Sequence, residues 1–161
     1  MLYKLVNALL EEAKNMLKVL SALVLLWSST AFAGDAIYTS LFSSNAVSGY
    51  DTVAYFTVGK PVKGKKKFST NYKKVNWLFS SAGNLAKFKA NPAKYEPQYG
   101  GFCAWAVAAK NDRASGDPLR WNIINDKLYL NYDKEIQNKW KKDIAGFIVK
   151  GDENWPGLLK N

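Results

Sequence analysis

Two stretches of the chain alternate apolar and polar residues, which is the period of half-buried β-strands. In residues 68–79 (FSTNYKKVNWLF), the side chains before the Lys73–Lys74 turn can meet those after it across a ladder. In residues 121–132 (WNIINDKLYLNY), the turn falls at Asn125–Asp126, two residue types that tolerate a positive φ. The pattern therefore predicts two β-hairpins. The facing positions are Phe68, Thr70 and Tyr72 with Val75, Trp77 and Phe79, and Trp121 and Ile123 with Leu128, Leu130 and Tyr132.

Apolar residues recur every three or four positions in three other segments, as they do on one face of an amphipathic helix. These segments are residues 82–91 after a cap at Ser81, residues 100–109, and residues 134–147 after a cap at Asp133. The apolar positions are Leu85 and Phe88, then Phe102, Trp105 and Ala106, then Ile136, Trp140 and Ile144. Hairpins that alternate with short helices predict a small α+β domain.

A short helical turn and a loop precede the first hairpin. In residues 45–56 (NAVSGYDTVAYF), Gly49 breaks the chain and Asp51 can cap the turn that follows. Residues 57–67 (TVGKPVKGKKK) are predicted to form a loop because glycine and proline punctuate them. The positions expected to be buried here are Val53, Tyr55 and Phe56.

The first 33 residues have the plan of a secretory signal peptide. Residues 19–27 (VLSALVLLW) are apolar apart from one serine, Lys18 precedes them, and small residues follow up to Ala33. The run is shorter than the roughly 20 apolar residues that span a bilayer. We expect cleavage after Ala33, with Met16 as a candidate start of translation. The alternative is an amphipathic N-terminal helix that stays attached.

Removal of residues 1–33 would leave residues 34–161 as one domain with a C-terminal helical extension. We expect this domain to be periplasmic or secreted and to meet the membrane only during translocation. A single cysteine cannot form an internal disulfide, so such an exported fold must be stabilised by its core.

Lysine and arginine outnumber the acidic residues. The chain has 161 residues, 48% of them hydrophobic, with 23 Lys and Arg against 13 Asp and Glu and a formal charge of +10. This balance favours anionic partners or a solvated basic surface. The candidate anion-binding residues are Lys63, Lys65, Lys66 and Lys67. No aromatic residue lies between them, so we expect no nucleic acid partner. The alternative is a sheet edge that lysine keeps soluble.

Metal binding is limited by the supply of soft donors, because the chain has one cysteine and no histidine. A structural zinc site needs four ligands, usually Cys or His. One subunit therefore cannot enclose such an ion. Two subunits could each offer Cys103 to one Cu(I), since thiolates favour that ion. The sequence thus leaves the cofactor and the oligomeric state open and makes copper the metal to test.

Cys103 has two alternative roles. If Gly100–Gly101 open a helix, the thiol lies in its first turn, where free N–H groups favour a thiolate. A redox or nucleophilic cysteine would then need Asp, Glu, Lys or Tyr as its base, since no histidine is available. The other role is core packing, because free cysteine behaves as a small buried hydrophobe.

Three segments carry a resemblance to a known family. They are GYDTVAYF, WLFSSAGNLAKFKANPAKYEPQYGGFCAWAV and LYLNYDKEIQNKWKKDIAGFIVKGDENWPGLL, within residues 45–159. The chain resembles exported proteins of the YHS-domain family. The resemblance implies a fold like that of treble-clef metal-binding domains, in which cysteines hold the ion. Ser80 and Asn84 stand at or next to the positions of those cysteines, so the family's ligands do not carry over.

The combined interpretation is a non-enzymatic, exported module that binds a small ligand or a metal ion. The candidate ligand-binding residues lie in or near the segments that resemble the family, and they are Asp51, Tyr55, Tyr99, Cys103 and Trp105. Two alternatives remain. One is a thiol-based redox or stress-response protein that uses Cys103. The other is an envelope protein that binds anionic surfaces through its lysine-rich loop.

Overall fold

The computed structural model describes residue 14 and residues 36–40 and 43–160. The predicted signal peptide and its cleavage site after Ala33 lie outside these residues, Lys14 excepted. The described residues from 36 to 160 belong to one compact unit. Within the described ranges, no helix has both the length and the apolar character needed to cross a membrane.

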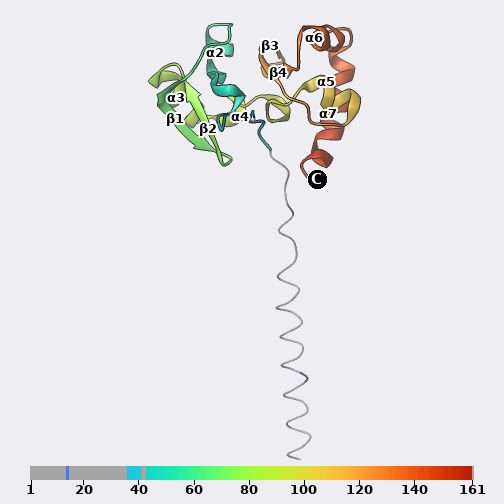
Figure 1. Cartoon of the computed structure of the whole chain (residues 1–161), viewed down its shortest axis with the longest axis horizontal. Coiled ribbons are helices and arrows are strands. Elements are labelled where there is room, and N and C mark those ends of the chain that lie inside the picture. Colours follow the sequence, from blue (N-terminus) through green and yellow to red (C-terminus); the bar gives the residue numbers. More distant parts are fainter. Residues whose placement is uncertain (1–13, 15–35, 41–42, 161) are drawn as a thin grey trace, which may run out of the picture. The chain divides into compact units, whose positions relative to one another are not determined.

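The first hairpin joins β1 (Lys65–Tyr72) and β2 (Val75–Phe79) in antiparallel register (Figure 1). Thr70 faces Trp77 and Tyr72 faces Val75, as the alternating pattern predicts. Both residues of the Lys73–Lys74 turn have positive φ, 50° and 64°, the geometry that matches the twist of a two-residue hairpin.

The predicted loop over residues 57–67 is wrong at both ends. Thr57 ends helix α2 (Thr52–Thr57), and Lys65, Lys66 and Lys67 already belong to β1. The Gly64 N–H donates to the Gly49 carbonyl, and a side chain at Gly64 would overlap the backbone of Leu78. This close approach lets the chain pair with β2 from Lys65 onward, before the end of the predicted loop. The register then shifts between Lys65 and Ser69, so residues 66–68 form a bulge. Phe79 pairs with Lys65 and not with Phe68, contrary to prediction.

The second hairpin joins β3 (Asp117–Ile124) and β4 (Lys127–Asn131). Trp121 pairs with Leu130 and Ile123 pairs with Leu128, as predicted. The Asn125–Asp126 turn has φ values of 50° and 58°. Tyr132 does not join this pairing, contrary to prediction. It follows the end of β4 and is 54% exposed.

Short helices flank the first hairpin. They are η1 (Val47–Gly49), α2 (Thr52–Thr57), α3 (Ala82–Ala90) and α4 (Pro92–Tyr95). Asp51 caps α2 and Ser81 caps α3, as predicted. Phe88 of α3 is buried against Trp77 and Phe79, with ring centroids 4.9 Å apart in both pairs. This aromatic contact holds α3 on the hairpin.

The helix predicted over residues 100–109 begins four residues later. Residues 98–101 form η2 (Gln98–Gly101), in which Gly100 and Gly101 have positive φ. Cys103 then bridges to Leu130, and its N–H donates to the carbonyl of Ala114. These long-range contacts keep Phe102 and Cys103 extended, so helix α5 runs from Ala104 to Lys110.

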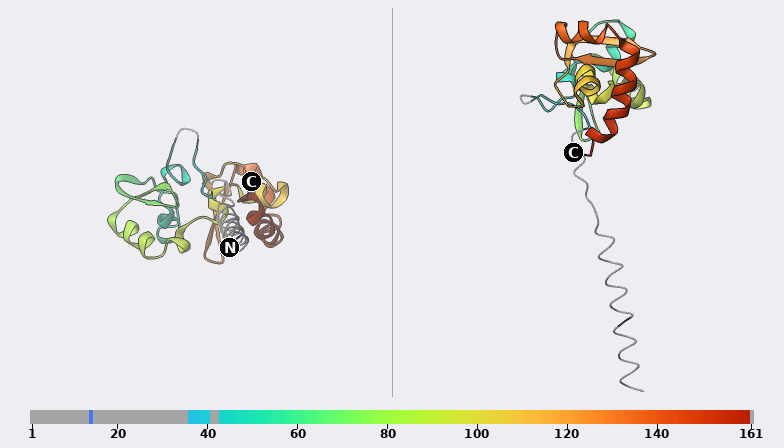
Figure 2. Two further views of the ribbon diagram at one scale, coloured as in Figure 1. Left: turned by 90° about the horizontal axis from the view of Figure 1, so that it is seen from below. Right: turned by 90° about the vertical axis from the view of Figure 1, so that its right-hand side faces the viewer.

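The single helix predicted over residues 134–147 is two helices. Helix α6 (Lys134–Trp140) is capped by Asp133 as predicted, and α7 (Ile144–Leu158) starts at a second cap, Asp143. The Asp143 carboxylate accepts a hydrogen bond from Gly146 N at 2.9 Å. Helix α7 packs along α5 beside the second hairpin (Figures 1 and 2).

Two apolar clusters fill the interior. The first gathers Trp77, Phe79 and Phe88 with Leu128 and Leu130 of β4. The second lies between η2, β4 and helices α5 to α7, and contains Tyr99, Phe102, Ala104, Val107, Tyr129, Trp140 and Leu158. Because β4 contributes to both clusters, it couples the two hairpins. The fold is α+β, as the sequence predicts.

Candidate functional site

Asp51 is the centre of a buried hydrogen-bond cluster, and its side chain is 0% exposed. One carboxylate oxygen, Oδ1, accepts from the N–H groups of Val53 at 2.9 Å and Ala54 at 3.2 Å. The other, Oδ2, accepts from Ser80 N at 2.8 Å, Ser80 Oγ at 2.6 Å and Asn84 Nδ2 at 2.7 Å. The carboxylate therefore joins α2, the end of β2 and α3 through five donors.

The cluster does not fit a metal ion, although the resemblance implies one near Ser80 and Asn84. The groups that face Asp51 there are hydrogen-bond donors, and they already use both carboxylate oxygens. A metal would have to displace them and would gain no thiolate or imidazole. Among the described residues, no group of three or more His, Cys, Asp or Glu side chains could hold an ion.

Tyr55 is buried one turn after Asp51 and lines neither pocket described below. Its hydroxyl donates to the Pro118 carbonyl at 2.9 Å, and its ring contacts Trp121 edge-on at 5.3 Å. Burial is the main cause that raises the pKa of this phenol, so it stays protonated. Tyr55 therefore fastens α2 to β3.

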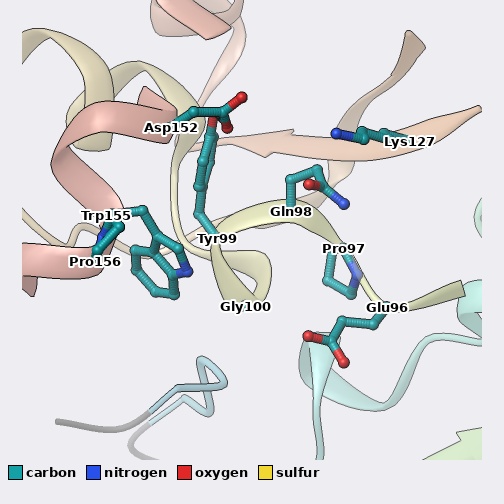
Figure 3. Close-up of a pocket in the computed structure, with 9 residues that line it drawn as sticks. All are labelled: Glu96, Pro97, Gln98, Tyr99, Gly100, Lys127, Asp152, Trp155 and Pro156. Carbon is teal, nitrogen blue, oxygen red and sulfur yellow. Dashed lines mark hydrogen bonds between the residues drawn. The ribbon is translucent and has the colours of Figure 1, made fainter. Parts of the chain in front are cut away.

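Tyr99 forms one wall of a pocket of about 340 Å³. Figure 3 shows the lining: Glu96, Pro97, Gln98, Tyr99, Gly100, Lys127, Asp152, Trp155 and Pro156. The η2 turn places Tyr99 there, with φ at 53°. Gly100 follows with φ at 61°, and a side chain at that position would overlap the carbonyl of Ala36. The turn therefore depends on glycine.

The Tyr99 hydroxyl is fixed against α7. It donates to Asp152 Oδ1 at 2.9 Å, and the Ile148 carbonyl lies 3.3 Å away as a second acceptor. Gly151 makes room for the contact, since a Cβ there would lie 2.5 Å from the Tyr99 oxygen. Burial first, and then the hydrogen bond to Asp152, raise the pKa of Tyr99. The phenol is thus a protonated wall of the pocket.

Glu96 also lines this pocket, and one of its carboxylate oxygens lacks a hydrogen-bond donor. Its Oε1 accepts from the ammonium of Lys73 at 2.5 Å. Its Oε2 is buried and has no hydrogen-bond partner. Trp155 supplies an indole face, and Lys127 and Asp152 add opposite charges. The pocket thus combines an aromatic wall with charged and hydrogen-bonding groups, the mixture found in small-ligand sites.

Cys103 and Trp105 line a second pocket, of about 250 Å³. Its other lining residues are Ala106, Lys110, Asp112, Ala114, Tyr132 and Ile136. Cys103 is 1% exposed, and its Sγ lies 3.9 Å from Asn131 Oδ1. Burial raises the pKa of the thiol, against smaller opposing effects from the backbone N–H groups of Trp105, Ala106 and Tyr132. The surroundings favour a neutral, packed thiol over a nucleophile.

We expect the native thiol of Cys103 to react with an aromatic disulfide reagent at pH 8 at least tenfold more slowly than the thiol of the unfolded chain, because it is buried and protonated. Absorbance of the released thiolate, with and without urea, measures the two rates. Equal rates in the two samples would show an accessible thiolate and would favour the redox alternative.

The candidate anion-binding lysines lie apart from both pockets. Lys63 donates to the Ser48 carbonyl at 3.1 Å and its ammonium lies 3.9 Å from the centroid of the Tyr50 ring. Lys65, Lys66 and Lys67 are exposed on β1. The five candidate ligand-binding residues are also separated. Tyr99 lines one pocket and Cys103 and Trp105 line the other, while Asp51 and Tyr55 are structural.

Sequence reasoning missed most of the Tyr99 pocket. Gln98, Lys127 and Asp152 come from three segments, and no local pattern connects them. Asp152 and Trp155 belong to the segment GDENWPGLL, which carries part of the family resemblance. That segment is the signal that could have led to Asp152 and Trp155.

The hairpins, the helices between them and the Tyr99 pocket define a small α+β domain with a ligand-sized site. Residues 53–99 match the family model of the YHS domain. The chain therefore carries a YHS domain, which extends from α2 to η2. No curated protein and no solved structure matches the chain.

Proposed function

We propose that this chain is a non-enzymatic binding module and that the Tyr99 pocket holds its ligand, a small organic molecule. The observation that supports this most strongly is the unpaired, buried Oε2 of Glu96 beside a pocket of about 340 Å³. Ligand sites occupy roughly 300–1,000 Å³ and join apolar walls to a few placed polar groups. A buried acceptor without a donor is costly, and rotation of the Glu96 side chain toward the pocket would let a ligand supply the donor.

The lining indicates the chemistry of the ligand. Glu96 and Asp152 offer carboxylate oxygens, so a hydrogen-bond donor such as an ammonium or amide N–H fits there. Trp155 offers an aromatic face to an apolar or cationic body. Lys127 can meet an acceptor at another part of the ligand. We therefore propose a compact polar molecule that carries both a donor group and an acceptor group.

The titratable groups favour binding over catalysis. Tyr99 borders the pocket, and burial and Asp152 keep its phenol protonated. Tyr129 packs behind it, and burial raises the pKa of Tyr129 to about 12. A general base works best with a pKa near the operating pH, and these phenols are far above it.

The cellular location that we propose rests on the predicted signal peptide in residues 1–33. Its apolar run and its small residues up to Ala33 support export, so we propose that the module acts in the periplasm or outside the cell.

Native mass spectrometry of the protein purified from its host tests the ligand proposal. We expect the wild type to carry a bound small molecule, and we expect Glu96→Gln to lose it because the variant removes the negative charge of a lining residue. Asp126→Asn is the matched control. It also breaks one surface ion pair, that of Lys94, but outside the pocket. A wild type without any adduct, or an equal loss in both variants, would contradict the proposal.

A further inference from the structure

The net positive charge of the chain is unevenly distributed. Residues 43–95, here called the basic half, contain ten lysines and one acidic residue, Asp51, which is buried in its own hydrogen-bond cluster. Residues 96–160 contain ten Lys and Arg and nine Asp and Glu. The lysines of the basic half are Lys60, Lys63, Lys65, Lys66, Lys67, Lys73, Lys74, Lys87, Lys89 and Lys94. The net charge is therefore +9 in the basic half and +1 in residues 96–160, because acidic residues are almost absent from the basic half.

These charges are available to a partner. All ten lysines are exposed. In the part of the chain that the structure describes, Lys73 pairs with Glu96 and Lys94 pairs with Asp126, and none of the other eight has an ion pair. The Asp51 carboxylate cannot offset them at the surface, because its five donors hold it inside.

Protection of a sheet edge does not explain this distribution. Lysines on an edge strand prevent strands of other chains from pairing. That role suits Lys65, Lys66 and Lys67 on β1. It does not suit Lys60 in the loop before β1 or Lys87 and Lys89 on α3, and these residues add to the same field.

We propose that the basic half docks on a bilayer surface rich in anionic phospholipid, so that the domain meets the membrane after translocation as well as during it. Clusters of four to eight basic residues bind such surfaces without a pocket, and neither pocket described above is lined by residues 43–95. Val58 supports a lipid partner over a soluble polyanion. It is 58% exposed, two residues before Lys60, and can enter the interface between headgroups and acyl chains.

Co-sedimentation of the full chain with vesicles tests the proposal. One set of vesicles contains phosphatidylglycerol in phosphatidylcholine, and the other contains phosphatidylcholine alone. Each lysine near an anionic surface contributes about a fivefold gain in binding, so Lys65→Gln/Lys66→Gln/Lys67→Gln should bind anionic vesicles roughly 100-fold more weakly than wild type. Raising the salt concentration should abolish the preference for anionic vesicles.

A matched triple variant, Lys141→Gln/Lys142→Gln/Lys150→Gln, removes the same charge from exposed lysines of the other half. We expect the logarithm of its affinity for anionic vesicles to fall by less than a third of the fall in Lys65→Gln/Lys66→Gln/Lys67→Gln. Equal losses in the two variants would show attraction by net charge and would overturn the proposal. The proposal would also be overturned if Lys65→Gln/Lys66→Gln/Lys67→Gln still bound anionic vesicles but no longer bound heparin. That result would indicate a soluble polyanion as the partner. The apolar leader is identical in all variants, and its contribution is measured on the neutral vesicles.

Discussion

Replacement of Asp51 by alanine should cost this protein about 4 kcal/mol of its free energy of unfolding, a large fraction of the roughly 5–15 kcal/mol typical of folded domains. The carboxylate accepts five hydrogen bonds, and the variant leaves the donors of Val53, Ser80 and Asn84 buried without an acceptor. Urea denaturation followed by tryptophan fluorescence measures the loss.

Two further variants keep the Asp51 experiment decisive. Ser81→Ala removes the single capping bond of α3 and should cost about 1 kcal/mol. Asp51→Asn keeps an acceptor for α2 but turns an NH₂ group toward Ser80 or Asn84. Its loss in the free energy of unfolding should therefore lie between those of Asp51→Ala and Ser81→Ala. An Asp51→Ala protein no less stable than Ser81→Ala would show that the cluster does not hold the fold.

The same cluster predicts the response to metal removal. Since hydrogen bonds fill the place that the resemblance implies for an ion, treatment with EDTA should leave the urea midpoint of the wild type unchanged. A lower midpoint after chelation, restored by zinc or copper, would show that an ion stabilises the fold.

Replacement of Gly100 by alanine should cost about 4 kcal/mol, and the loss should come chiefly from one segment leaving the fold. The new Cβ would overlap the carbonyl of Ala36, which follows from the close contact between η2 and residues 36–38. The Gly100 carbonyl now accepts from Tyr38 N at 2.9 Å, and Ile37 beside it is 2% exposed. Releasing this segment exposes Ile37, worth about 2–3 kcal/mol, and the positive φ adds about 1 kcal/mol.

Gly59→Ala is the control for Gly100→Ala. Gly59 also has a positive φ, 65°, but a Cβ there would meet no atom within 4 Å. Gly59→Ala should therefore lower the free energy of unfolding by about 1 kcal/mol, which is the cost of the positive φ alone. Similar losses in the two variants would show that the contact with Ala36 does not contribute to stability.

The hairpins could be predicted because their information is local. Alternation places Trp121 and Ile123 on the same face of the hairpin as their partners Leu130 and Leu128 in β4. The Asn125–Asp126 turn supplies the positive φ values. The first hairpin forms in the same way although Lys73–Lys74 is a weak turn pair. The aromatic residues on its strands impose the register, and the lysines adopt the turn that it requires.

The start of α5 and most of the pocket could not be predicted, because distant residues determine them. The segment GGFCAWAV is apolar throughout and has no polar residue to mark a helix boundary. The boundary is set by Ala114 and Leu130, which hold Cys103 extended. The sequence also predicts Asp51 as a cap of α2. Its second oxygen is bound by Ser80 and Asn84, which lie 29 and 33 residues further along the chain.

The segment that matches the YHS model ends at Tyr99, yet the fold does not end there. Tyr99 inserts between Tyr129 and Trp155, and the core around Trp77 is completed by Leu128 and Leu130. A fragment trimmed to residues 53–99 would present these aromatic side chains to solvent and would aggregate or stay unfolded. The segment that matches the family model is smaller than the unit that folds, so any transplant of this domain into another protein must include α7.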